Sequence, residues 1–282
     1  MRRLLVGALL LLAFAAPAQA NGLPDAGAYL ARSLDSRGCA REPGGTASAN
    51  LSAWVALGLI ATGRSAAAPA RCIEDHSRSV RALTDVELAV LALAAARRDP
   101  RNAGGRDLVR TILAAQRNGR IGPLIATNQF GILALRAAGA PVPASARRAL
   151  VADQRPDGAW PVAPGGDGDS NLTATGIQAA IAAGVAPSDP VVTRALAALG
   201  RFRSRGGYAL ARGAAPDAQS TAWALQGLAA VRRADPTARA YLAGLEGSDG
   251  AFAYQRGVRI TPVWVTAQSV LGVAGRAFPL RG

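Results

Sequence analysis

The chain alternates between two kinds of apolar segment, each about a dozen residues long. Segments of the first kind, such as VVTRALAALGRF at 191–202, carry apolar residues at helical spacing on one face, with Arg194 and Arg201 off that face. Segments of the second kind, such as DVELAVLALAAAR at 85–97, are apolar on almost every side. An amphipathic helix lies at a surface, whereas a helix that is apolar all round is buried. The pattern therefore predicts outer helices that alternate with buried inner helices.

The outer segments end in a recurring turn that contains glycine. QRPDGAW at 154–160 superposes on EGSDGAF at 246–252 and on FRSRGGY at 202–208. Weaker copies are QRNGRI at 116–121 and DSRGC at 35–39. A second series runs in step with the first and opens the inner segments, with the small or hydroxyl-bearing residues Ser52, Asn128, Thr173, Thr221 and Thr266. Both series leave one gap, which the all-apolar segment above fills, so we expect six units of about 40–48 residues, a period typical of repeat folds.

The repeated turn is expected to be architectural rather than catalytic. Its Asp-Gly pair ends an outer helix, because glycine tolerates a positive φ. The aromatic residue two positions later is expected to fill the seam between neighbouring outer helices. We therefore predict structural roles for Gln154, Asp157, Gly158, Trp160, Asp249, Gly250 and Phe252.

The first 20 residues are typical of a signal peptide. Arg2 and Arg3 precede an apolar run from Leu4 to Ala16, and Ala18-Gln19-Ala20 is a small-x-small cleavage site. An uncleaved membrane anchor is the alternative. No later stretch reaches the ~18 apolar residues of a membrane span. We expect residues 21–282 to form one domain, either secreted or held in the cell envelope.

The charge of the chain does not point to nucleic acid. The formal net charge is +14, and every basic residue is Arg. These arginines are scattered, whereas nucleic-acid binding favours a basic stripe interleaved with aromatic residues. We interpret the charge mainly as a solvated exterior, with loose attraction to anionic polymers of the envelope.

Two cysteines, Cys39 and Cys72, form an even pair. In an exported protein such a pair predicts a disulfide. No metal site is expected, because His76 is the only histidine and no Cys-x-x-Cys is present. His76 is interpreted as a partly exposed residue without a chemical role.

The residues of these units resemble the prenyltransferase/squalene-oxidase repeat. The strongest matches are DQRPDGAW, DSNLTATGIQAA and DAQSTAWALQGL, and the likeness covers nearly all of the chain after residue 20. The resemblance implies an all-α, α6/α6 toroid of six helix pairs, a fold shared by squalene-hopene cyclases, protein prenyltransferases, complement thioester domains and cobalamin carriers. Such a repeat specifies the fold better than the function.

The chemistry of each of these families can be compared with the chain. Class II terpene cyclases protonate an alkene with an Asp-x-Asp-Asp motif, and the nearest match contains Asp167 and Asp169, with Ser170 where the third acid is expected. The alternative is that these carboxylates cap a helix. Protein prenyltransferases hold zinc with Asp, Cys and His, which one histidine and two cysteines expected to form a disulfide do not supply. Thioester domains need a Gly-Cys-Gly-Glu-Gln segment, which the chain lacks. Sugar-cleaving toroids use two carboxylates, and Asp167, Asp169 and Asp217 lie at equivalent loops.

The hole of a toroid is the remaining candidate site. Its rim is expected to be built from the starts of the inner helices, with ligand-binding residues Trp54, Asn128, Gln129, Phe130, Asn171, Gln219, Trp223 and Trp264. Backbone N–H groups at those starts favour acceptors and anions. The tryptophans could stack on a flat ligand or belong to the core.

The favoured reading of the sequence is binding of a bulky molecule or partner without catalysis. No cofactor is expected, although a cobalamin-like or isoprenoid-like ligand fits the resemblance. One alternative is a cyclase-like isomerase that uses Asp167 and Asp169. The other is an envelope interaction module that acts through its Arg-rich exterior.

Overall fold

A computed structural model describes residues 23–280 of the chain. The predicted signal peptide, residues 1–20, lies outside the described residues. The helices of the described part are α1 (Leu23–Arg32), α2 (Ala49–Ala61), α3 (Ala67–His76), α4 (Leu83–Ala95), α5 (Leu108–Ala114), α6 (Ile125–Ala137), α7 (Ala144–Ala152), α8 (Ser170–Ala182), α9 (Pro190–Gly200), α10 (Ala218–Ala230), α11 (Pro236–Ala243) and α12 (Pro262–Val273).

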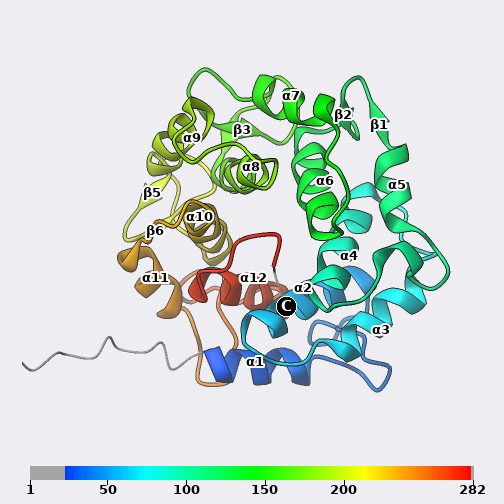
Figure 1. The fold of residues 1–282 in the computed structure, drawn as a ribbon. Helices are drawn as coiled ribbons and strands as arrows, with labels where there is room; N and C mark the ends of the chain where they lie inside the picture. The colour runs from blue at the N-terminus through cyan, green and yellow to red at the C-terminus, as the bar shows by residue number, and fades with distance from the viewer. Residues whose placement is uncertain (1–22, 281–282) are drawn as a thin grey trace, which may run out of the picture.

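The even-numbered helices form a closed inner ring. Each packs against the next, from α2 through α4, α6, α8 and α10 to α12, and α12 packs against α2. The odd-numbered helices lie outside this ring, as Figure 1 shows in a view along its axis. The α6/α6 toroid expected from the repeat is therefore confirmed.

The two kinds of helix differ in burial as the apolar pattern predicts. In α2 every residue from Leu51 to Leu59 is buried. In α9 the buried residues, Val191 and Leu199 among them, fall on one face, and Arg194 is exposed on the other. Hydrophobic burial on one side or on all sides thus assigns each helix to its ring.

Short strands occur where the chain reverses between an outer and an inner helix, a feature that the sequence pattern did not predict. Each is two residues long and pairs antiparallel with its neighbour. The pairs are β1 (Gln116–Arg117) with β2 (Arg120–Ile121), β3 (Trp160–Pro161) with β4 (Gly168–Asp169), and β5 (Arg203–Ser204) with β6 (Gly207–Tyr208). A 3-10 turn, η1 (Pro100–Asn102), precedes α5.

One hydrogen bond per unit links the two sequence series. The turn glycines of the five recognisable copies all have positive φ, between 80° and 90°. Two residues after each glycine, the backbone N–H donates to the inner-helix series at 2.8–3.2 Å. The five pairs are Ala40 with Ser52, Ile121 with Asn128, Trp160 with Thr173, Tyr208 with Thr221, and Phe252 with Thr266. The series therefore recurs because it satisfies a buried backbone donor at the end of every turn.

The alanine that follows the hydroxyl-bearing residue, as in Thr221-Ala222 and Thr266-Ala267, sets how closely neighbouring inner helices approach. A Cβ added at Gly58 of α2 would lie 3.1 Å from the Cα of Ala267 on α12. A Cβ added at Gly272 of α12 would lie 2.6 Å from the Cα of Ala222 on α10. Alanine on one helix and glycine on the next thus let the two backbones come into contact. This accounts for the alanine that follows the hydroxyl-bearing residue in these units.

The QRPDGAW turn joins two outer helices. Gln154 donates from Nε2 to the carbonyls of Gly158, at 3.0 Å, and of Val191 on α9, at 2.8 Å. Gly158 has φ +87° and lies against the backbone of Arg194, also on α9. These contacts tie the turn to α9.

The Trp160 side chain fills a seam that is lined by an inner helix as well as an outer helix. Its Nε1 donates to the carbonyl of Leu150 on α7 at 2.9 Å, and its ring packs against Gly176 of α8. Trp160 has no exposed surface. The side chain therefore joins the outer helix α7 to the inner helix α8.

The last copy of the turn closes the ring. Gly250 lies against the backbone of Asp25 on α1, the first outer helix. Asp249 accepts a hydrogen bond from the backbone N–H of Ala251, as Asp157 does from Ala159. The Arg259 side chain hydrogen-bonds Asp249 and so holds the pKa of that carboxyl below its usual value. The predicted structural roles in this copy agree with these contacts.

Two further observations bear on where the protein works. The predicted disulfide between Cys39 and Cys72 is present. No helix between residues 23 and 280 is long and apolar enough to cross a bilayer.

Candidate functional site

Three aromatic side chains meet in the interior of the ring. Trp54 of α2 and Trp223 of α10 lie edge to face with centroids 6.0 Å apart. Phe130 of α6 lies 5.8 Å from Trp223. These helices alternate around the ring and are not neighbours, so their side chains can meet only across its middle. The sequence placed these three residues at the site; their convergence is a property of the closed ring.

The chain fills this interior with its own segment after α12. Residues 276–280 turn back into the ring, shown in red in Figure 1. The Phe278 ring lies 5.9 Å from Trp223 and 6.5 Å from Trp54. Its backbone N–H donates to Gln178 Oε1 on α8 at 2.8 Å. Phe278 is 4% exposed and Leu280 7%, so the interior next to the aromatic cluster is occupied, a question that the sequence left open.

Amide side chains of α10 and α12 lie beside this aromatic cluster. Trp223 donates from Nε1 to Gln268 Oε1 on α12 at 3.1 Å. Gln226 follows Trp223 by three residues on α10, which places it on the same helix face. Neither amide atom of Gln226 has a hydrogen-bond partner among the described residues, and the same holds for Gln268 Nε2. A buried polar group without a partner costs about 1–3 kcal/mol, so a further hydrogen-bond partner would stabilise these amides.

The other predicted rim residues do not join this cluster. Asn128 is fully buried, accepting from the Ile121 N–H and donating to the Ala146 carbonyl, so it is part of the repeat architecture. Gln129 is buried and lies near Gly176 of the neighbouring helix. Asn171, Gln219 and Trp264 are half-buried at the starts of α8, α10 and α12.

Several inner-helix starts are already capped by the chain itself. Ser48 accepts from the third N–H of α2, Asp169 from that of α8 and Asp217 from that of α10. Both carboxylate oxygens of Glu42 accept from the first N–H groups of α12, at 2.9 and 2.8 Å. The expected preference of these starts for acceptors is therefore met internally.

The candidate acids come from α4 and from the segment before α8, not from the helices that carry the aromatic cluster. Asp169 caps α8, with Oδ1 2.8 Å from the Leu172 nitrogen, and burial raises its pKa against the hydrogen bonds from the helix N–H groups. Asp167 is exposed. Glu87 of α4, which sequence reasoning passed over, has no exposed surface and no hydrogen-bond partner among residues 23–280, and burial raises its pKa well above the usual value. Only its place inside an all-apolar helix could have singled it out.

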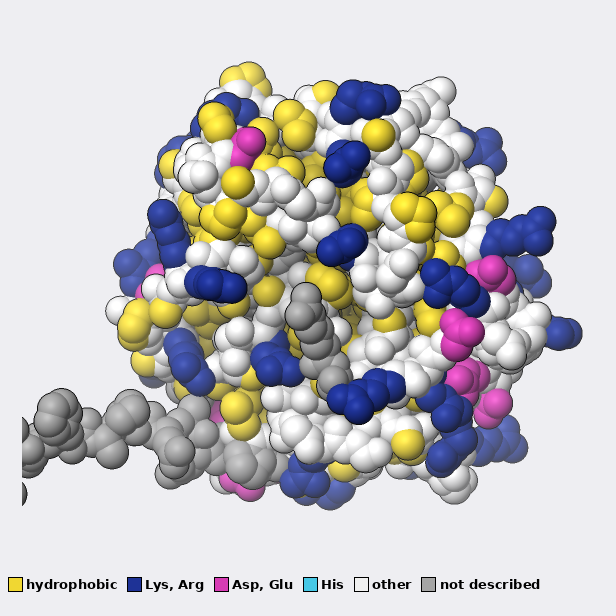
Figure 2. Space-filling view, in the orientation of Figure 1, with side chains coloured by type: hydrophobic (Ala, Val, Ile, Leu, Met, Phe, Trp, Pro, Cys, Tyr) yellow, Lys and Arg dark blue, Asp and Glu magenta, His cyan; other side chains and the backbone are white. Residues whose placement is uncertain are grey.

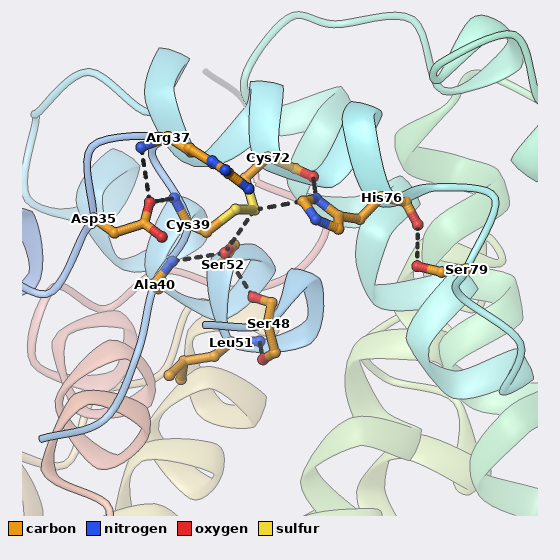
Figure 3. The surroundings of a disulfide bond; sticks show 10 residues. All are labelled: Asp35, Arg37, Cys39, Ala40, Ser48, Leu51, Ser52, Cys72, His76 and Ser79. Carbon is orange, nitrogen blue, oxygen red and sulfur yellow. Dashed lines mark hydrogen bonds between the residues drawn. A yellow bond between two sulfur atoms is a disulfide. The ribbon is translucent and has the colours of Figure 1, made fainter. Parts of the chain in front are cut away.

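The disulfide has a histidine beside it. Figure 3 shows His76 one helical turn from Cys72 on α3, with Nδ1 3.8 Å from Cys72 Sγ. The possible ligand atoms of Cys39, Cys72 and His76 lie within 4.8 Å of one another. His76 is exposed, as the sequence suggested, but its position beside the sulfurs was not expected.

The charged exterior matches the sequence interpretation in form. Figure 2 shows arginine side chains spread singly over the face of the ring that Figure 1 presents, while acidic side chains gather towards one edge. Such a spread is that of a solvated surface.

Comparison with known proteins places the chain by its fold. No family model and no curated protein matches its sequence. A variant of the type II terpene cyclase MstE from Scytonema, in complex with geranylgeranyl dihydroxybenzoate, superposes with a TM-score of 0.71 at 16% identity, over 91% of this chain and 96% of that one. A glycosidase variant in complex with glucose superposes with a TM-score of 0.65 at 14% identity, over 90% and 95% of the two chains.

A larger enzyme shares the same architecture. The ent-copalyl diphosphate synthase from Streptomyces platensis superposes with a TM-score of 0.57 at 19% identity, over 80% of this chain and 50% of that one. The chain therefore has the terpenoid cyclase-like α/α toroid fold. At these identities the likeness concerns the fold alone, and function has to be argued from the site.

Proposed function

We propose that the protein binds an apolar molecule in the interior of its toroid without transforming it, and that residues 276–280 occupy this site until the ligand displaces them. The observation that carries the proposal is the packing of Phe278 on Trp54 and Trp223 in the middle of the ring. A segment whose Phe278 is held there by a backbone hydrogen bond to Gln178 and by ring contacts imitates the ligand that we propose.

The chemistry of the interior favours an isoprenoid-like ligand with a small polar group. Trp54, Phe130 and Trp223 offer faces and edges to an apolar body. The amides of Gln178, Gln226 and Gln268 offer donors and acceptors to a hydroxyl or carbonyl. A cobalamin-like ligand is the less favoured alternative, because three aromatic rings and Phe278 share the space that so bulky a molecule would need.

Terpene cyclisation is the second candidate, and the fold of the cyclases among its structural neighbours favours it. Against it, protonating an alkene demands an unusually strong acid. Burial raises the pKa of both Asp169 and Glu87, which makes each a weaker acid than an ordinary carboxyl. Asp169 is also engaged in capping α8. Binding without catalysis therefore has the better support.

Export is part of the proposal. A disulfide and the lack of a membrane-spanning helix among the described residues fit a protein outside the cytoplasm. The segment at 1–20 would direct it there, either to the medium or to the cell envelope.

The test is to weaken the resident segment and measure binding. Burying a Phe side chain contributes about 1.5–3 kcal/mol, so a ligand that takes its place should bind Phe278→Ala about 10- to 150-fold more tightly than the unmodified protein. Farnesol is the apolar probe, and quenching of Trp223 and Trp54 fluorescence reports binding. Glucose serves as the polar probe, which should bind neither protein.

The control is Leu210→Ala, because Leu210 is 46% exposed and lies in the loop between β6 and α10, outside the aromatic cluster. It should bind farnesol as the unmodified protein does. Equal affinities for Phe278→Ala and the unmodified protein would show that the segment does not compete for the site. Cyclised farnesol after incubation would establish the cyclase instead.

A further inference from the structure

The first and second units bring two cysteines and a histidine together. Cys72 and His76 are four residues apart on α3, so they lie on one helix face. Cys39 follows the glycine turn of the first unit, and its Cα lies 5.2 Å from that of Cys72. The sulfurs and the imidazole come within 4.8 Å of one another, as Figure 3 shows.

The spacing of these atoms suits one metal ion when the sulfurs are free. Tetrahedral zinc, with Zn–S of about 2.3 Å and Zn–N of about 2.0–2.1 Å, holds a sulfur and a nitrogen roughly 3.6 Å apart. The distance from Cys72 Sγ to His76 Nδ1 is 3.8 Å. Two thiolates and an imidazole are a donor set that selects zinc over the oxygen-preferring ions.

We propose that reduction of the Cys39–Cys72 disulfide creates a zinc site formed by Cys39, Cys72 and His76. A phosphine reductant gives two electrons to the disulfide and becomes a phosphine oxide, and the water that supplies the oxygen of that oxide also supplies the two protons of the resulting thiols. Zinc then binds both sulfurs as thiolates, and the two thiol protons pass to solvent. A water molecule completes the tetrahedron from the side on which His76 is exposed. In the oxidised protein the sulfurs are bonded to each other and the site is closed.

The backbone around the sulfurs is held by contacts that do not depend on the disulfide. Asp35 accepts hydrogen bonds from the backbone N–H groups of Arg37 and Cys39, both at 2.9 Å. Gly38 packs against the backbone of Ala68 at the start of α3. The two cysteines therefore stay close after reduction, which lowers the cost of organising the ligands.

The Ser52 hydroxyl ties the same region to the inner ring. It lies 3.4 Å from Cys72 Sγ, accepts from the Ala40 N–H at 2.9 Å, and lies 2.7 Å from the Ser48 carbonyl. Ser52 belongs to the repeat architecture, so this group beside the Cys72 sulfur is held in place by the fold itself. His76 Nδ1 lies 2.9 Å from the Cys72 carbonyl and must release its proton, or turn its ring, to bind the ion.

The experiment measures zinc binding by the reduced and oxidised protein. The full chain is reduced with a phosphine under native conditions, and mass spectrometry confirms two free thiols. Zn²⁺ is then titrated in competition with a chromophoric chelator. We expect one zinc per reduced chain and none per oxidised chain, with no response to Mg²⁺. A reduced protein that binds no zinc would overturn the proposal.

His76→Ala is the matched variant, because it leaves both cysteines and the disulfide in place. In the reduced form it should lose at least about tenfold in zinc affinity. Co²⁺ in place of zinc should give a tetrahedral thiolate spectrum in the unmodified protein. Equal affinity in the variant and the unmodified protein would show that the histidine is not a ligand.

Reduction could also loosen the fold, and the thermal transition covers that outcome. Zinc should then raise the melting temperature of the reduced protein, and raise it less in reduced His76→Ala. No shift in either protein would count against the site. The proposal does not depend on what the interior of the toroid binds, so the two can fail separately.

Discussion

Gly158→Ala tests whether the repeated turn stabilises the toroid through a close contact between outer helices. Gly158 has φ +87°, and a Cβ there would lie 2.4 Å from the carbonyl oxygen of Arg194 on α9. An L side chain in the left-handed region costs about 1–2 kcal/mol. Forcing a methyl group into a packed seam costs about 1–3 kcal/mol more. The variant should therefore lose about 2–5 kcal/mol of unfolding free energy.

Gly184→Ala separates the two contributions. Gly184 has φ +88°, nearly the same backbone conformation, but an added Cβ would have no neighbour within 4 Å. It should lose only the conformational part, about 1–2 kcal/mol. Urea unfolding of both variants, followed by far-UV circular dichroism with the disulfide intact, gives the difference directly. If the two losses agree within about 0.5 kcal/mol, the contact of the turn with α9 does not stabilise the fold.

Further changes test the packing of Trp160, the titration of Glu87 and the covalent link between Cys39 and Cys72. Trp160→Ala should lower the unfolding free energy by about 3–5 kcal/mol, and Trp160→Phe by less, because it keeps ring packing and loses the hydrogen bond to Leu150; similar losses in urea unfolding would contradict this. Because burial raises the folded-state pKa of Glu87, the stability it contributes is present at low pH and is lost as the pH rises from the ordinary glutamate range towards the raised pKa. Glu87→Gln should therefore gain stability relative to the unmodified protein as the pH rises above the ordinary glutamate range, and a difference that stays constant with pH would refute the assignment. Reduction of the Cys39–Cys72 disulfide in the absence of metal should cost about 3–4 kcal/mol for a separation of 33 residues, measured by urea unfolding, and an unchanged midpoint would show that the link constrains little.

Much of the fold could be predicted from the sequence, because it depends on local physical chemistry. The alternation of amphipathic and all-apolar segments assigned helices to two rings. This worked because burial on one side or on every side determines which positions of each helix are apolar. Gly158 and Gly250 marked the turns, because a positive φ favours glycine wherever it occurs. The pairing of Cys39 with Cys72 followed from there being only two cysteines.

The candidate site was predicted only in part, because its members meet through ring closure. Trp54, Phe130 and Trp223 were named because they lie at the starts of inner helices, whereas Asn128, named on the same ground, is a hydrogen-bonding part of the turn. A periodic pattern identifies equivalent positions but does not say which of them face the interior.

The sequence by itself determined the repeat, the two classes of helix, the turns and the disulfide, since each depends on residues close together or on a count. Only the tertiary structure decided that residues 276–280 fill the interior, that Trp54, Phe130 and Trp223 meet there, and that Cys39 lies beside His76. These features join parts of the chain, such as Gln178 and Phe278, that no local pattern connects. Their contacts exist because six helix pairs close into a ring and bring those parts to the same place.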